Sequence, residues 1–113
     1  MVGSEVELSA RKCKPCEGGT PPMDDKEVRV MLGKVDGWEW RDNTIRKKFK
    51  FKDFSESMKF VNRVAVLAEE EGHHPNIFIS WNRVTLTLTT HAIGGLSEND
   101  FILAAKIDKY IAA

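Results

Sequence analysis

One short segment alternates strictly between apolar and polar residues, and it constrains the fold more than any other part of the chain. From Val84 to Thr89, valine and leucine fall on one side and threonine falls on the other. This two-residue period is typical of a β-strand with one buried face. The chain must therefore contain a sheet that is covered on one side, and we predict one of its strands over residues 84–91.

Three other strands are predicted around short turns. Residues 37–40 and 45–51 flank the turn pair Asp42-Asn43, and residues 77–81 precede the alternating segment with only Asn82-Arg83 between them. Connections this short join neighbouring antiparallel strands into hairpins. Two such hairpins predict a four-stranded antiparallel sheet.

Helix-capping residues mark three helices. Asp24, Asp53 and Ser97 are N-cap types, and Asp53 and Ser97 are each followed three residues later by an acid. The predicted helices cover residues 24–32, 54–71 and 97–113. The resulting order, α-β-β-α-β-β-α, predicts an α+β fold in which the helices lie on one face of the sheet.

The second helix carries more apolar residues than one sheet face requires. Its principal stripe is predicted to be Phe54, Met58, Val61, Ala65 and Ala68, which recur at spacings of three and four. A second set, Phe60, Val64 and Leu67, widens that stripe. So broad an apolar surface favours a subunit interface in a small domain.

Length and charge narrow the class of protein. The chain has 113 residues, which predicts one domain over residues 23–113 behind an irregular arm of residues 1–22. Seventeen basic residues balance 17 acidic ones, so we expect neither direct nucleic-acid binding nor membrane attachment through net charge. No apolar run approaches the roughly 20 residues of a spanning helix, and residues 1–10 lack the apolar block of a secretory signal. The expected compartment is the cytoplasm.

Two segments of the chain each allow a functional and a purely structural interpretation. Arg46 to Lys52 interleaves five basic residues with two phenylalanines, as in a nucleic-acid platform, but its alternation also fits an amphipathic strand, which the zero net charge favours. Cys13 and Cys16 fit a redox pair or half of a zinc site. No second ligand pair is present, and the surrounding glycines and prolines favour two reduced thiols in the arm.

All three histidines lie between residues 73 and 91, on both sides of the third predicted strand. Histidine titrates near neutral pH, so His73, His74 and His91 are candidates for acid–base catalysis without a metal. A three-histidine zinc site is the second hypothesis, although side chains of adjacent residues diverge in an extended segment. The third is an interaction protein in which the histidines are packed polar residues.

Two acids accompany the histidines. Glu69 lies in the last turn of the second helix, where the helix dipole disfavours negative charge, and this makes it a candidate site residue. Asp100 occupies the third position of the last helix, where it would complete a capping box with Ser97. That capping role leaves a role in the site open.

Together these residues resemble the pterin-4a-carbinolamine dehydratase family. The resemblance rests on Glu69-x-x-x-His73-His74-Pro75, on Thr89-Thr90-His91 and on Gly95-Leu96-Ser97-Glu98-x-Asp100, and it runs from Gly37-Trp38 through the last helix. The Cys13-to-Gly19 arm resembles the N-terminal extension of many non-animal members. Ile77 and Asn99 depart from animal members, which carry tryptophan and arginine there.

The resemblance implies an enzyme that removes water from 4a-hydroxytetrahydrobiopterin to give quinonoid dihydropterin, and so regenerates tetrahydrobiopterin. It implies that His73 and His91 are the main acid–base groups and that His74 binds and orients the substrate. It places Glu69, Pro75, Thr89, Thr90 and Asp100 around the pterin. No metal or cofactor is expected, because the pterin is the substrate.

The resemblance also concerns partners. The family forms dimers and tetramers, so we expect a homodimer or homotetramer. Animal members also act in the nucleus as dimerisation cofactors of a homeodomain transcription factor. The alternative function is therefore an interaction module, of the transcriptional coactivator type, built on the same fold.

Overall fold

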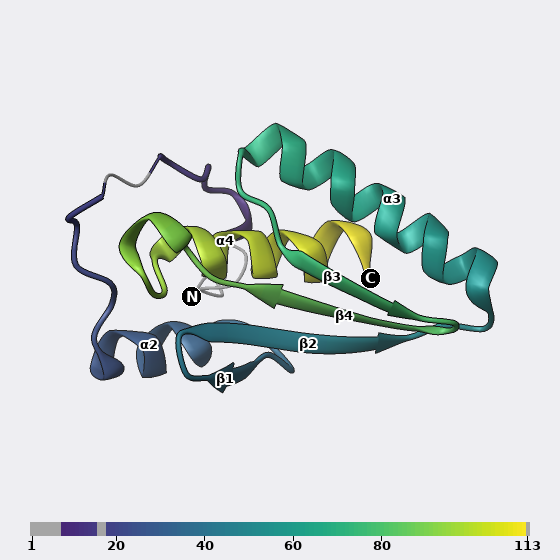
Figure 1. Ribbon diagram of the computed structural model, residues 1–113, viewed down its shortest axis with the longest axis horizontal. Helices are drawn as coiled ribbons and strands as arrows, with labels where there is room; N and C mark the ends of the chain where they lie inside the picture. The colour runs from purple at the N-terminus through teal and green to yellow at the C-terminus, as the bar shows by residue number, and fades with distance from the viewer. Residues whose placement is uncertain (1–7, 16–17, 113) are drawn as a thin grey trace.

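The computed structural model describes residues 8–15 and 18–112, in which one sheet is covered on one face by helices (Figure 1). The elements are α2 (Asp25–Leu32), β1 (Glu39–Arg41), β2 (Thr44–Lys50), α3 (Phe54–Glu71), β3 (Asn76–Ser80), β4 (Arg83–Leu88), the 3-10 helix η1 (His91–Ile93), α4 (Glu98–Lys106) and the π-helical segment η2 (Ile107–Ile111). This order confirms the predicted α+β fold.

The four strands lie in the order β1-β2-β4-β3, and every neighbouring pair is antiparallel. Each predicted hairpin is present, and the β2–β4 pairing joins the two hairpins. Ile45 lies opposite Leu88 and Phe49 opposite Val84, so these four side chains share one face of the sheet. All four are buried, and the alternation in the sequence therefore identified the core face correctly.

The strand ends differ from the prediction. The first strand begins at Glu39 and not at Gly37, which adopts a φ of 78°, and the ends of β2 and β3 shift by one residue. Trp81 is not the last residue of β3, because it adopts a φ of 50° in the turn between β3 and β4. The fourth strand does not reach His91, because β4 ends at Leu88. The Thr90 amide donates to the Gly95 carbonyl at 2.9 Å, which turns the chain back and closes a loop that contains η1. His91 consequently lies on the short helical turn η1, beyond the end of β4.

Helix α3 buries mainly the second predicted set, together with Ala68 of the first stripe. Its buried apolar residues are Phe60, Val64, Leu67 and Ala68, whereas Phe54 is 49% exposed. Both stripes have helical periodicity, and the larger side chains of the second set fill the space above the sheet. The remaining apolar surface keeps the subunit interface as a prediction.

The predicted starts of the three helices agree with the structure, whereas the last helix is α-helical only to Lys106 and continues as the π-helical η2. The Asp24, Asp53 and Ser97 side chains each accept a hydrogen bond from a backbone amide of the first turn, as N-cap residues do. Glu56 does not complete the capping box expected at Asp53 but forms an ion pair with Lys59. At the other end of α3, Gly72 adopts a φ of 66°, a conformation that favours glycine.

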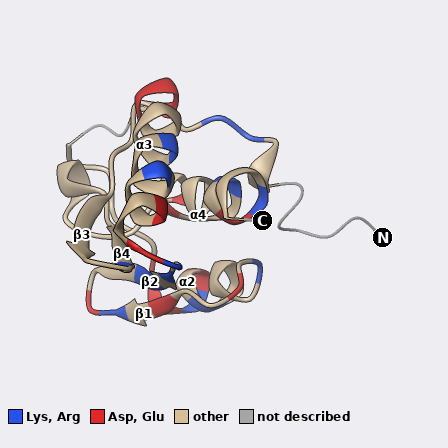
Figure 2. Cartoon of the chain, turned by 90° about the vertical axis from the view of Figure 1, so that its right-hand side faces the viewer, with Lys and Arg blue, Asp and Glu red and all other residues tan. Residues whose placement is uncertain are grey.

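Acidic and basic residues alternate along much of the described chain. Figure 2 shows acidic and basic residues mixed over strands and helices, and Arg46 on β2 forms an ion pair with Glu39 on β1 at 3.0 Å. The hydrogen bond from Arg46 lowers the pKa of the Glu39 carboxyl below its usual value. Among the described residues, no helix combines the length and the apolar character that a membrane span requires.

Part of the arm belongs to the core. Leu8 and Ser9 are helical and fully or almost fully buried, and Leu8 is a member of the main hydrophobic cluster. Further along, Met23 donates its amide to the Leu96 carbonyl at 2.9 Å. The arm therefore contacts the body both before and after residues 16 and 17, and the boundary at residue 22 stays a prediction.

The contact between Gly95 and Pro22 gives a first testable prediction. A Cβ added at Gly95 would lie 2.7 Å from the Pro22 Cβ, closer than packed carbons approach. We expect Gly95→Ala to lower the free energy of unfolding by about 1–3 kcal/mol, measured by urea denaturation, because Pro22 must move away from the loop that precedes α4. Gly33→Ala is the matched control, because its added Cβ would make only ordinary contacts, the nearest at 3.5 Å. Equal stability of the two variants would contradict close packing at Pro22.

Candidate active site

A cavity of about 280 Å³ opens where the end of α3, the η1 loop and the start of α4 meet the arm. Its walls consist of residues from these four segments, together with the end of β4. The lining residues are Lys14, Pro15, Gly72, His73, His74, Thr89, Thr90, His91, Ala92 and Asn99. The structure thus brings all three histidines to one cavity.

His73 is held by a buried carboxylate. Its Nε2 lies 2.6 Å from Oδ1 of Asp100, and the two side chains are 12% and 0% exposed. A carboxylate only accepts hydrogen bonds, so Nε2 of His73 carries the hydrogen in this pair. In the neutral ring, Nδ1 is then the atom that can accept a proton.

Asp100 performs the capping role and contacts the site at the same time. Its Oδ2 accepts hydrogen bonds from the Ser97 amide at 3.0 Å and from Oγ1 of Thr90 at 2.8 Å. Its Oδ1 remains for His73. The capping box and the histidine contact therefore use different oxygens of one carboxylate, and the first turn of α4 fixes the position of His73.

Glu69 contacts the second of the two adjacent histidines. Its Oε2 lies 2.6 Å from Nε2 of His74, not of His73. Both side chains are more than half exposed, at 77% and 59%, so solvent screens this pair strongly. The turn at Gly72 directs the two adjacent histidines toward different carboxylates.

The threonines support the cavity from the end of β4. Thr90 is 5% exposed and hydrogen-bonds to Ser97 and Asp100, whereas Thr89 donates to the Asn43 carbonyl at 2.6 Å. His91 is exposed and lines the same cavity. Glu69, Pro75 and Asp100 do not line the cavity, so their predicted substrate contacts stay predictions.

Sequence reasoning missed the arm as a wall of the cavity. Lys14 and Pro15 line the cavity, and the buried side chain of Asn99 hydrogen-bonds to the Lys14 backbone. Neither periodicity nor capping signals could have indicated this, because the arm has no repeating pattern. The only signal was Asn99 itself, at a position where animal members of the similar family carry arginine.

Cys13 is a neutral thiol in this arrangement. Partial burial, followed by the nearby Glu71 carboxylate, raises the pKa of Cys13 to about 12. Thiolate chemistry at neutral pH is therefore disfavoured at Cys13. Cys16 lies outside the described residues, so the predicted pair of reduced thiols is only half described. Within the described ranges, no three or more His, Cys, Asp or Glu residues form a group that could hold a metal ion.

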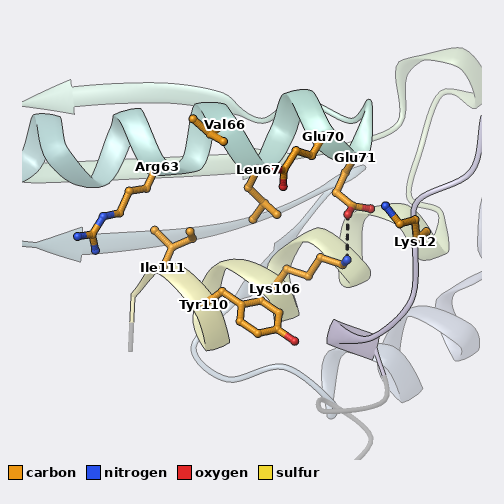
Figure 3. A pocket seen from close by; sticks show the side chains of 9 residues that line it. All are labelled: Lys12, Arg63, Val66, Leu67, Glu70, Glu71, Lys106, Tyr110 and Ile111. Carbon is orange, nitrogen blue, oxygen red and sulfur yellow. Dashed lines mark hydrogen bonds and ion pairs between the residues drawn. The ribbon is translucent and has the colours of Figure 1, made fainter.

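A larger cavity of about 510 Å³ lies on the other side of the arm, between α3, α4 and η2 (Figure 3). Its floor contains a buried ion pair, in which Nζ of Lys106 lies 2.9 Å from Oε2 of Glu71. Burial alone would raise the pKa of Glu71, but the hydrogen bonds from the Cys13 amide and Lys106 outweigh burial and lower that pKa. No histidine lines this cavity, so we place the candidate active site at the smaller one.

Comparisons with known proteins show which family this chain is similar to. Residues 21–110 match the family model described as pterin 4 alpha carbinolamine dehydratase. A protein of Nitrosospira multiformis, provisionally named pterin-4-alpha-carbinolamine dehydratase, is 50% identical over 102 residues, which cover 90% of each chain.

Two solved structures are also similar. One, a transcriptional coactivator/pterin dehydratase from Brucella melitensis, has a TM-score of 0.75 and 37% identity, with 80% of this chain and 98% of that chain covered. The other, a pterin dehydratase-like protein described as a RuBisCO assembly factor in the alpha-carboxysome, has a TM-score of 0.52 and 29% identity. The match covers 63% of this chain and 82% of that one.

Proposed function

This chain belongs to the pterin-4a-carbinolamine dehydratase family, and we propose that it dehydrates 4a-hydroxytetrahydrobiopterin to quinonoid dihydropterin. The observation that carries this proposal is the convergence of His73, His74 and His91 on one cavity, where Asp100 backs the first and Glu69 the second. Such a site offers proton donors and acceptors near neutral pH. The reaction would regenerate tetrahydrobiopterin, with the pterin as substrate and no cofactor.

The reaction needs one acid and one base. The C4a–O bond breaks as the hydroxyl takes a proton from an acid and leaves as water. The N5 proton passes to a base, and the electron pair of the broken N5–H bond forms the N5=C4a double bond. We assign the base to Nδ1 of His73, because Nε2 donates to Asp100 and the carboxylate stabilises the imidazolium that forms.

The remaining groups have supporting roles in this scheme. His91, on η1 and exposed, supplies the proton to the leaving hydroxyl. His74 binds and orients the pterin, and Thr89 and Thr90 form the floor of the cavity. Glu69, Asp100 and Pro75 hold His73 and His74 in position.

The test is stopped-flow dehydration of freshly generated 4a-hydroxytetrahydropterin, followed with and without a chelator. We expect acceleration over the uncatalysed reaction that does not change with the chelator. His91→Ala should reduce the acceleration by about 10²-fold, because general acid catalysis contributes at least this much, while an exposed histidine contributes little to stability. No acceleration by folded protein would refute the enzyme assignment, and loss on chelation alone would favour the zinc hypothesis.

The alternative is an interaction module that keeps the fold. It is favoured by the exposed apolar residues of α3, among them Phe54 and Val66 at 49% and 61%, and by the coactivator and assembly-factor roles described for the two structural neighbours. A subunit partner, as a homodimer or homotetramer, would cover the same surface. A His73→Ala protein that loses dehydration yet retains every cellular role would support the module.

A further inference from the structure

The arm is fastened to the helices at three positions before it reaches the cavity. Arg11 forms an ion pair with Glu98, and the Cys13 amide donates to Oε1 of Glu71 at 2.9 Å. The Lys14 amide donates to Oδ1 of Asn99 at 2.9 Å.

Asn99 holds the backbone of Lys14 from both sides. Its amide oxygen accepts from the Lys14 amide, and its amide nitrogen donates to the Lys14 carbonyl. The Asn99 side chain is buried, and its own backbone carbonyl accepts a hydrogen bond from Sγ of Cys13. Pro15 further restricts Lys14 to extended geometry. A lysine on an otherwise irregular arm is thus placed on the rim of the histidine cavity.

The position of Lys14 matters because of the charges of the residues that line the cavity. Among the described residues that line it, Lys14 is the only one with a permanent charge, because the others are apolar, hydroxyl, amide or imidazole side chains. Asp100 and Glu69 lie behind the histidines and do not line the cavity. Lys14 thus contributes a positively charged residue to the lining, and an ammonium suits a ligand rich in hydrogen-bond acceptors.

We propose that the arm completes the pterin site and that Lys14, positioned by Asn99, is a substrate-binding residue whose ammonium donates to an acceptor of the pterin. This inference rests on the proposed function. It assigns Lys14 to affinity, not to proton transfer, since the three histidines already supply the acid and the base. Asn99 acts through Lys14 and is a positioning residue.

The experiment measures binding and turnover in the full chain. The binding probe for calorimetry is 7,8-dihydrobiopterin, which lacks the 4a-hydroxyl and cannot lose water. We expect Lys14→Met to weaken binding by about tenfold and to raise KM similarly, with kcat within about twofold, because a charge-assisted hydrogen bond is lost. Lys12→Met is the matched control, since Lys12 lies two residues away but lines the other cavity (Figure 3).

Asn99→Ala distinguishes positioning from a separate contact. If Asn99 acts through Lys14, its variant raises KM as Lys14→Met does, and the double variant binds no more weakly than either single variant. Binding by Lys14→Met equal to that of the wild type, or an equal loss in Lys12→Met, would overturn the inference while the function stands. A wild type that neither binds the probe nor accelerates dehydration would overturn both.

Discussion

Asp100→Asn is expected to reduce the rate of dehydration by roughly 10³–10⁴-fold, about as much as His73→Ala. The side chain of Asp100 has no exposed surface and accepts hydrogen bonds at both oxygens. An asparagine has only one acceptor oxygen, and the Ser97 amide and Thr90 hydroxyl both require one. Its amide nitrogen must therefore face His73.

The consequence is a change of tautomer. An amide nitrogen can only donate to Nε2 of His73, so the ring hydrogen must move to Nδ1. That is the atom to which we assign the N5 proton, and the neutral ring then no longer accepts there. Nitrogen-15 NMR of the histidine rings reports the tautomer directly, and we expect His73 to change from the Nε2–H to the Nδ1–H form.

A control must separate the effect on His73 from a loss of helix stability, because Asp100 also caps α4. Ser97→Ala removes the other half of the capping box at about 1 kcal/mol of stability, but the backbone amide of residue 97 can still donate to Asp100. We expect its kcat to remain within severalfold of the wild type and its His73 tautomer to be unchanged. Full activity of a folded Asp100→Asn protein would refute the assignment of His73 as a carboxylate-oriented base.

The regular part of this fold could be predicted because each signal in it is local. Alternation in β4 identified the core face, and capping residues placed the starts of the helices. The choice of stripe on α3 could not be predicted, because Phe54 and Phe60 both belong to apolar stripes of helical period. Only the sheet below decides which stripe is buried.

The convergence of the three histidines could be predicted, but their pairings and the contribution of the arm could not. The three histidines were identified from their residue type and proximity in sequence, and they line one cavity. The pairing of Glu69 with His74 depends on the left-handed turn at Gly72, and the loop around His91 depends on the Thr90–Gly95 bridge. Lys14 reaches the cavity through a contact 85 residues away in sequence, which no local pattern encodes.

Lys106→Met is expected to lower the free energy of unfolding by about 3–5 kcal/mol at neutral pH, measured by urea denaturation. The side chains of Lys106 and Glu71 are 10% and 4% exposed (Figure 3), so the variant leaves a buried carboxylate whose remaining partner is the Cys13 amide. Methionine fills similar space, so the loss reports the charge and not a cavity. Lys106→Met/Glu71→Met removes both charges, and we expect it to be more stable than Lys106→Met.

The pH dependence of this loss has a definite sign. In the wild type the pKa of Glu71 lies below its usual 4.5, so the pair stabilises the fold above that pH and the stabilisation is lost as pH falls through the folded-state pKa. Without Lys106, two of the interactions that lower the pKa of Glu71 are lost, so this pKa is expected to rise and protonation relieves the penalty at a higher pH in the variant. The stability difference between wild type and Lys106→Met should therefore shrink as pH falls below about 4.5. A difference that stays constant from pH 7 to pH 3, or a loss below about 1 kcal/mol at pH 7, would contradict a buried and charged pair.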